Sequence, residues 1–402
     1  MTTIKTQKTE RQFYIDWLRI ILIISVFLFH IGMLFNTWPW HIKNERLYGG
    51  ILIQIMTFLH FWRMPLLFML AGAGTYFALG KRTPGQYLSE RFRRLVIPLA
   101  AGIFILVPVQ VYMEKINQYD SLPSYYLHMF EGIYPSGNFS WHHLWFIAYL
   151  FVISLFISPF LNLLRGEGFR KFLARIEKIV TKPLALNLFI IPLLISQILL
   201  RPFFETGTND LINDWASITY YIIFFLTGFI LLQSVTITEA IRKYRFWYLA
   251  ETIVTCVFLF KVSAMVKPED LADTFQEYTS IFLAWACALT ALGFAKQYLN
   301  RNNTFRRLAN EAIYPFYLLH QPVIIVTGHF IVQLEIDVLW KVFMVLLSSF
   351  ALTISIYWFI IKPFNLFRII FGMRRLEKAN RVIVSSQLTA TENKREEILL
   401  SA

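Results

Sequence analysis

The 402-residue sequence predicts an all-α protein, a polytopic bundle of transmembrane helices, and three observations favour this fold class. Hydrophobic residues make up 56% of the chain and charged residues only 16%, which is less charge than the surface of a soluble domain carries. Apolar runs recur along the chain, each near the roughly 20 residues that a helix needs to cross a membrane. The basic residues, which give a net charge of +13, cluster in the short loops between these runs. The charge therefore indicates membrane topology, and nucleic acid is not an expected partner.

About ten apolar runs are long enough to span a membrane. The second is longer than one crossing requires, and Pro65 inside it predicts a kink, a tilt or two entries into the membrane. The runs cover residues 15–35, 48–79, 94–113, 143–164, 183–200, 216–235, 247–266, 278–299, 312–333 and 339–361. They predict one transmembrane domain over residues 15–361, between a cytoplasmic N-terminal segment, 1–14, and a polar cytoplasmic tail, 362–402.

Alternate loops between the runs differ in charge. One set is basic and includes Arg93, Arg170, Arg245 and Arg307, whereas the loops between them are acidic, with Glu205, Asp210, Asp214, Asp270 and Glu277. Because basic loops stay on the cytoplasmic side, we expect the first set and both termini inside the cell. An even number of spans is consistent with this orientation.

Ionisable side chains within the apolar runs are candidate site residues, because burying them in a membrane is costly. The first run contains Asp16, Arg19 and His30. At about 100° per residue these three lie in one narrow stripe of a helix, with His30 about 21 Å along the axis from Asp16. A histidine at that depth, in line with an ion pair, is more often functional than structural.

A second basic group, Arg91, Arg93 and Arg94, stands at the cytoplasmic start of the third run. Three guanidinium groups there could bind phosphates, but such clusters more often only fix topology or contact anionic lipid. In the second run, Arg63 needs a partner, and Asp16 is one candidate.

The remaining candidates are histidines and aromatic residues near the ends of later runs, namely His143, Trp145, Tyr317 and His320. His320 could face a cavity, or it could form a structural hydrogen bond to a neighbouring helix. Adjacent His142 and His143 lack metal-ligand spacing, and no cysteine or carboxylate supports them. We therefore predict no metal site.

Together these motifs resemble the acyltransferase 3 family over about residues 11–375. The resemblance rests on Asp16-x-Leu18-Arg19 followed by His30, then Met64-Pro65-Leu66 with Ala71-Gly72, Arg91-x-Arg93, His143-Leu144-Trp145-Phe146 and Tyr317-Leu318-Leu319-His320. Trp17, where many members have glycine, and the run Trp62–Leu66 resemble the glucan-modifying branch, the glucans biosynthesis protein C type.

The resemblance implies an O-acyltransferase that takes an acyl group, acetyl or succinyl, from acyl-CoA on the cytoplasmic side and transfers it to a carbohydrate such as a periplasmic glucan or an envelope glycan. It implies His30 as the catalytic histidine, in line with Asp16 and Arg19, and Arg91 and Arg93, with Arg94 beside them, at the donor phosphates. The supporting or substrate residues are Arg63, His143, Trp145, Tyr317 and His320.

Acyl-CoA is thus expected as donor substrate, with no permanently bound cofactor. The expected surroundings are membrane lipid and a carbohydrate acceptor in a bacterial inner membrane, with homodimer formation left open. The alternative function is a transporter of a small anionic or acyl-bearing solute, since spans with buried charges suit that class as well. No repeated pair of interrupted helices supports the transporter.

Overall fold

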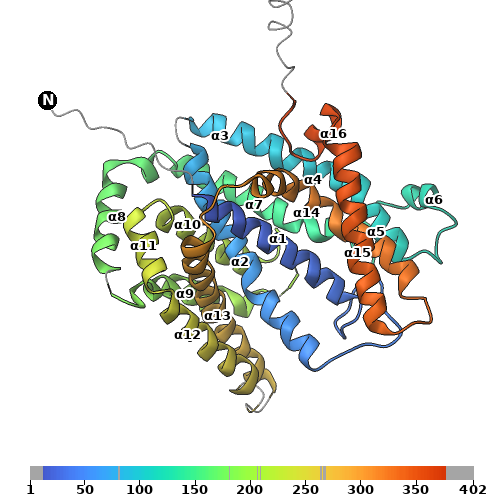
Figure 1. Ribbon diagram of the computed structural model, residues 1–402, viewed down its shortest axis with the longest axis horizontal. Helices are drawn as coiled ribbons and strands as arrows, with labels where there is room; N and C mark the ends of the chain where they lie inside the picture. Colours follow the sequence, from blue (N-terminus) through green and yellow to red (C-terminus); the bar gives the residue numbers. More distant parts are fainter. Residues whose placement is uncertain are drawn as a thin grey trace, which may run out of the picture.

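The computed structural model of the chain describes residues 12–376, apart from 80–81, 181, 206, 209, 263–264 and 266–268. Within that part of the chain the secondary structure is helical, and the only β pairings are two isolated bridges. The α-helices in chain order are α1 (Phe13–Met33), α2 (Ile51–Leu79), α3 (Pro84–Arg91), α4 (Ile97–Ala101), α5 (Val107–Glu114), α6 (Leu122–Leu127), α7 (Trp145–Ile157), α8 (Glu167–Ile179), α9 (Ile190–Leu200), α10 (Trp215–Leu231), α11 (Val235–Lys243), α12 (Arg245–Val257), α13 (Glu269–Tyr298), α14 (Thr304–Ile331), α15 (Val338–Ile356) and α16 (Asn365–Ile370). Figure 1 shows their arrangement.

Seven helical segments of the described residues are long and apolar enough to cross a membrane, and an eighth results if α10 and α11, bent by 104°, are counted as one. The seven are Phe13–Met33, Ile51–Leu79, Pro84–Glu114, His142–Phe160, Ala185–Phe203, Leu271–Tyr298 and Val338–Ile361. The predicted polytopic helical membrane protein is confirmed, but the predicted count of about ten spans is not. The predicted runs 247–266 and 312–333 overlap α12 and α14, which are not among the seven. The cytoplasmic placement of both termini remains a prediction.

Helices α1 and α2 lie at the centre of the molecule, with α8, α11 and α12 on one side and α15 and α16 on the other (Figure 1). Helix α1 packs against α14 and α2, and α2 packs against α10 and α13. The contact between α2 and α10 is close because glycine stands on both helices. A Cβ atom on Gly72 would come within 1.9 Å of the carbonyl oxygen of Phe225, and one on Gly228 within 1.8 Å of that of Met69. Small residues at such crossings are typical of membrane bundles.

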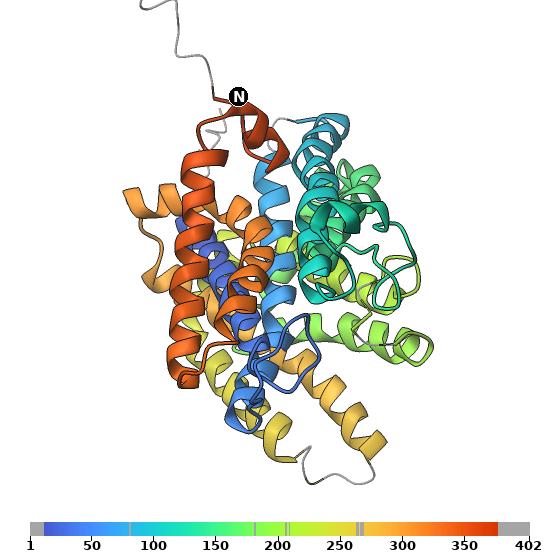
Figure 2. The ribbon, with the colours of Figure 1, turned by 90° about the vertical axis from the view of Figure 1, so that its right-hand side faces the viewer.

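The third span is one long segment, Pro84–Glu114, in which two π-helical turns, Phe92–Val96 and Gly102–Leu106, interrupt the α-helix. It begins at a capping box, in which Thr83 and Gln86 exchange side-chain and backbone hydrogen bonds, with Pro84 as the first helical residue. Helices α3 and α16 lie at one end of the molecule, and the connection between α1 and α2 lies at the other (Figures 1 and 2).

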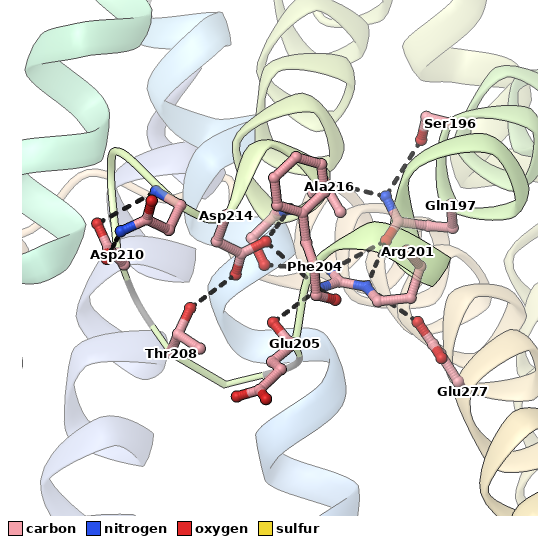
Figure 3. A network of polar contacts seen from close by, with 12 residues as sticks. Ser196, Gln197, Arg201, Phe204, Glu205, Thr208, Asp210, Asp214, Ala216 and Glu277 are labelled. Atoms are coloured by element: carbon pink, nitrogen blue, oxygen red, sulfur yellow. Dashed lines mark hydrogen bonds and ion pairs between the residues drawn. The ribbon is translucent and has the colours of Figure 1, made fainter.

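A mostly buried ion cluster joins the end of α9 and the start of α10 to α13 (Figure 3). The guanidinium of Arg201 lies 3.3 Å from a carboxylate oxygen of Asp214 and 3.0 Å from one of Glu277. Asp214 also caps α10 by accepting from the backbone N–H of Ser217 at 2.9 Å. Two of the predicted acidic loops therefore converge on one arginine, which gives these carboxylates a structural role.

Residues beyond the predicted transmembrane domain also pack on the bundle. Arg368 of α16 is buried, and its guanidinium lies 3.2 Å from the carboxylate of Glu311 on α14. Its side chain also donates to the backbone carbonyls of Lys362 and Arg374. This part of the predicted polar tail is thus folded and packs against one end of α14.

Candidate active site

Two histidines from the first and last thirds of the chain meet in the centre of the bundle. Nδ1 of His30, on α1, lies 2.8 Å from Nε2 of His320, on α14, and the rings are stacked with centroids 5.0 Å apart. The second ring nitrogen of His320, Nδ1, lies 2.5 Å from the backbone carbonyl oxygen of Tyr317. His320 is fully buried, and His30 is partly exposed.

These contacts fix the protonation pattern of the neutral pair. A carbonyl oxygen only accepts, so His320 donates from Nδ1 to Tyr317, and its Nε2 carries a lone pair. That lone pair accepts from Nδ1–H of His30, so the lone pair of His30 is on Nε2. The arrangement therefore presents the Nε2 lone pair of His30 as a base or a nucleophile, oriented by a second histidine.

His143 and Tyr317 hold the surroundings of this pair in place. His143 donates from Nε2 to the backbone carbonyl of Leu318 at 3.0 Å, and the hydroxyl of Tyr317 donates to the backbone carbonyl of His143. Trp145 packs among aromatic rings, with its centroid 5.6 Å from that of Tyr221. In the structure these residues have supporting contacts, and their part in binding a substrate stays a prediction.

Arg63 lies beside the histidine pair, and none of the described carboxylates pairs with it. Its guanidinium carbon is 3.4 Å from the ring centroid of Phe29, the residue before His30, and the side chain is buried. Among the described residues, its Nε and Nη1 atoms have no hydrogen-bond partner. The predicted pairing with Asp16 is wrong, because Asp16 stands near the other end of α1, about 21 Å along the helix axis from His30. A buried, unpaired guanidinium here is a candidate contact for an anionic group of the substrate.

Asp16 instead pairs with Arg306, at the start of α14, and its carboxylate is also 3.7 Å from the guanidinium of Arg19. Arg306 is 2% exposed and donates to the side chain of Asn302 at 2.9 Å. This ion pair joins α1 to α14, the two helices that carry His30 and His320. Asp16 thus contributes to the site by aligning these helices. Sequence reasoning missed Arg306, because it stands in a basic loop that indicated topology alone.

A cavity of about 610 Å³ is lined by residues of α1, α2, α3, α7, α14 and α16. Six arginines and two glutamates are among its lining residues, which makes it cationic. The arginines are Arg19, Arg91, Arg94, Arg307, Arg368 and Arg374. The inner part of the cavity reaches Tyr317, whose backbone carbonyl binds His320.

The three arginines predicted for the donor phosphates are divided by the π-helical turn at Phe92–Val96. Arg91 and Arg94 line the cavity, and Arg91 donates to the hydroxyl of Thr75 at 3.0 Å. Arg93 is exposed and is not among the lining residues. Arg307 and Arg374, which the motif did not point to, complete the cationic wall. In the described part of the chain, no group of three or more histidine, cysteine or carboxylate side chains is arranged to hold a metal.

The chain belongs to the acyltransferase 3 family, because the family's model, an acyltransferase domain, matches residues 12–361. Fold and family together define a membrane-embedded acyltransferase. The chain is similar to glucans biosynthesis protein C of Salmonella paratyphi B, Salmonella heidelberg and Salmonella enteritidis, with 24% identity over 152 residues. That match covers 36% of this chain and 37% of each relative. No solved structure matches the chain. The resemblance inferred from the motifs is confirmed.

Proposed function

We propose that this protein takes an acyl group from acyl-CoA at the cytoplasmic face of a bacterial inner membrane and transfers it to a carbohydrate hydroxyl at the outer face. Membership of the acyltransferase family supports the reaction type over the transporter alternative. The names of the related proteins support a glucan acceptor. Acetyl and succinyl are the acyl groups that we expect.

The observation that carries the proposal is the cationic cavity whose lining reaches Tyr317, the residue that binds His320 through its backbone carbonyl. Acyl-CoA has phosphates at one end and a thioester at the end of a thin pantetheine arm. Guanidinium groups bind phosphates through charge-assisted, often bidentate hydrogen bonds, so Arg91, Arg94 and Arg307 suit the nucleotide end. The arm would then pass Tyr317 and bring the thioester to the histidine pair.

At the thioester, His30 has two roles open to it. As a general base, its Nε2 takes the proton of the acceptor hydroxyl, whose oxygen attacks the acyl carbon while the carbon–sulfur bond breaks. As a nucleophile, the same lone pair attacks the thioester first and carries the acyl group. In both cases negative charge develops on the carbonyl oxygen, and the unpaired guanidinium of Arg63 is placed to stabilise it.

The test uses purified wild-type protein with acetyl-CoA or succinyl-CoA, measuring CoA release by its free thiol and binding of CoA by calorimetry. We expect His30→Gln to lower turnover by about 10²–10⁴, because glutamine keeps hydrogen bonding but takes no proton at neutral pH. Binding of CoA should be unchanged, since His30 is not among the residues that line the cavity.

The matched control is His329→Gln, on the same helix as His320, where the histidine is hydrogen-bonded to neighbouring Gln333. This variant should keep wild-type turnover. Wild-type turnover in His30→Gln would remove His30 from the mechanism and move the assignment to His320. Accumulation of an acyl-CoA or solute across vesicles without thiol release would instead favour the transporter.

A further inference from the structure

A second group of polar side chains lies near the histidine pair, on residues that no sequence motif singled out. His41 stands in the connection between α1 and α2, and its Nδ1 lies 2.5 Å from a carboxylate oxygen of Glu114, the last residue of α5. The other oxygen of Glu114 accepts from the hydroxyl of Tyr134 at 3.1 Å. Nε2 of His41 lies 3.3 Å from the side-chain nitrogen of Gln321, the residue after His320.

We propose that His41, held by Glu114, is the base that takes the proton from the acceptor hydroxyl; this proposal rests on the proposed acyl transfer. Carboxylate oxygens only accept, so Glu114 holds the proton of His41 on Nδ1. The lone pair is then on Nε2, which accepts from the amide of Gln321. A carboxylate that fixes the tautomer of a histidine and stabilises its protonated form is the arrangement that general-base catalysis uses.

The position of His41 and Glu114, here called the dyad, fits an acceptor that arrives from the side opposite the cationic cavity. The connection between α1 and α2 lies at the end of the molecule away from α3 and α16 (Figures 1 and 2). The side chain of Glu114 is 24% exposed, whereas that of His41 is 5% exposed. The carboxylate is therefore the part of the dyad that contacts solvent. Inward, Trp40 stacks on His30 with ring centroids 6.0 Å apart. His41 therefore lies between the outer surface and the acyl site.

His142 provides an independent observation at the same place. Its ring centroid is 4.5 Å from that of His41, and its Nε2 is buried with no hydrogen-bond partner among the described residues. Its backbone φ of 39° is in the left-handed region, which is uncommon for residues other than glycine. A buried nitrogen without a hydrogen-bond partner destabilises the folded state. An acceptor hydroxyl that forms a hydrogen bond with Nε2 of His142, beside His41, would satisfy this nitrogen.

Nε2 of His30 takes the acyl group from the CoA sulfur, whose bond to the acyl carbon breaks. The acceptor O–H proton then moves to Nε2 of His41, the oxygen forms the ester bond, and the bond between the acyl carbon and Nε2 of His30 breaks. CoA leaves as the thiolate and takes up a proton from water on its own side. His41 returns its proton to water near the exposed edge of Glu114. His41 is thus the acceptor-side base and Glu114 its positioning residue, and of the two roles open to His30 the nucleophilic one remains.

The experiment compares two nucleophiles. Cells that lack the native gene carry wild-type, His41→Gln or Glu114→Gln protein, and mass spectrometry measures acylated envelope glycan. The purified proteins are also given acetyl-CoA or succinyl-CoA with hydroxylamine, which attacks an acyl group without a base and yields a hydroxamate. We expect His41→Gln to lower glycan acylation by about 10²–10⁴. Hydroxamate formation and the KM for the donor should stay near the wild-type values.

Glu114→Gln should change glycan acylation in the same direction, with hydroxamate formation again retained. The matched control is His128→Gln. His128 and Glu131 form a similar pair, 2.7 Å apart, on the exposed surface of the connection between α6 and α7. Wild-type glycan acylation in His41→Gln would overturn the proposal. Equal loss of both products would show a structural role for His41. If the wild-type protein yields neither product, the proposed function itself fails.

Discussion

At the residue scale, the tautomer of His30 depends on a chain of acceptors that ends at a backbone carbonyl. Tyr317 fixes the proton of His320, and His320 in turn fixes that of His30. Because the last acceptor is part of the α14 backbone, the pattern depends on how α14 is placed against α1. The buried pair of Asp16 and Arg306 sets that placement some 21 Å along α1.

The first prediction concerns this ion pair. Arg306→Met should lower the free energy of unfolding by about 3–5 kcal/mol, because it leaves the Asp16 carboxylate without its main partner. The double variant Asp16→Leu/Arg306→Met should be less destabilised than the single one, since no buried charge remains. Thermal unfolding in detergent measures both. Arg307→Met, the exposed neighbour, is the control. An Arg306→Met melting temperature equal to that of the control would show that the pair does not hold α1 to α14.

At the element scale, the crossing of α2 and α10 depends on two glycines. Gly72→Ala should destabilise the bundle by about 1–3 kcal/mol or more, since the added methyl group meets the backbone carbonyl of Phe225 at 1.9 Å. Gly228→Ala should behave in the same way against Met69. Gly168→Ala on α8 has no atom within 4 Å of the new methyl group and should stabilise slightly. Melting temperatures of the three variants check this. A neutral Gly72→Ala would mean that the helices separate at little cost.

The π-helical turn in the third span leads to another prediction at this scale. Arg91→Ala and Arg94→Ala should each weaken CoA binding by about 1.5–3 kcal/mol, roughly ten- to 150-fold in Kd, through loss of a charge-assisted contact. Arg93→Ala should change Kd little, because Arg93 is exposed outside the cavity. Calorimetry on folded protein makes the comparison. Equal effects at Arg91 and Arg93 would favour the phosphate pair that the sequence motif implied.

At the scale of the whole molecule, composition was sufficient to predict a helical membrane bundle, but not the number of spans. Hydropathy reports how apolar a run is, and a helix buried among other helices is as apolar as one that faces lipid. Helix α14 illustrates the difficulty, because residues 312–333 were predicted as a span, whereas α14 is not among the seven segments that are apolar enough and its central residues are buried in the bundle. Hydropathy averaged along the sequence likewise does not reveal the bend between α10 and α11.

The site was predictable where an ionisable residue interrupts an apolar run. His30 and His320 are of this kind, and the structure brings them into hydrogen-bond contact. Arg307 and Arg374 were not predictable, because an arginine at a membrane surface looks the same whether it lines a cavity or only fixes topology. His41 and Glu114 lie in a connection and at a helix end, where polar residues are ordinary. Only their approach in three dimensions distinguishes them.

The last prediction concerns orientation, which decides from which side each substrate comes. The charge asymmetry of the loops places Lys171, on α8, inside the cell and Asp120, between α5 and α6, outside. Both side chains are exposed, so cysteine is tolerated at either place. In a Cys256→Ala/Cys287→Ala background, a membrane-impermeant maleimide on intact cells should label Asp120→Cys at once. Lys171→Cys should react only after the membrane is permeabilised, and its labelling in intact cells would reverse the assigned sides of donor and acceptor.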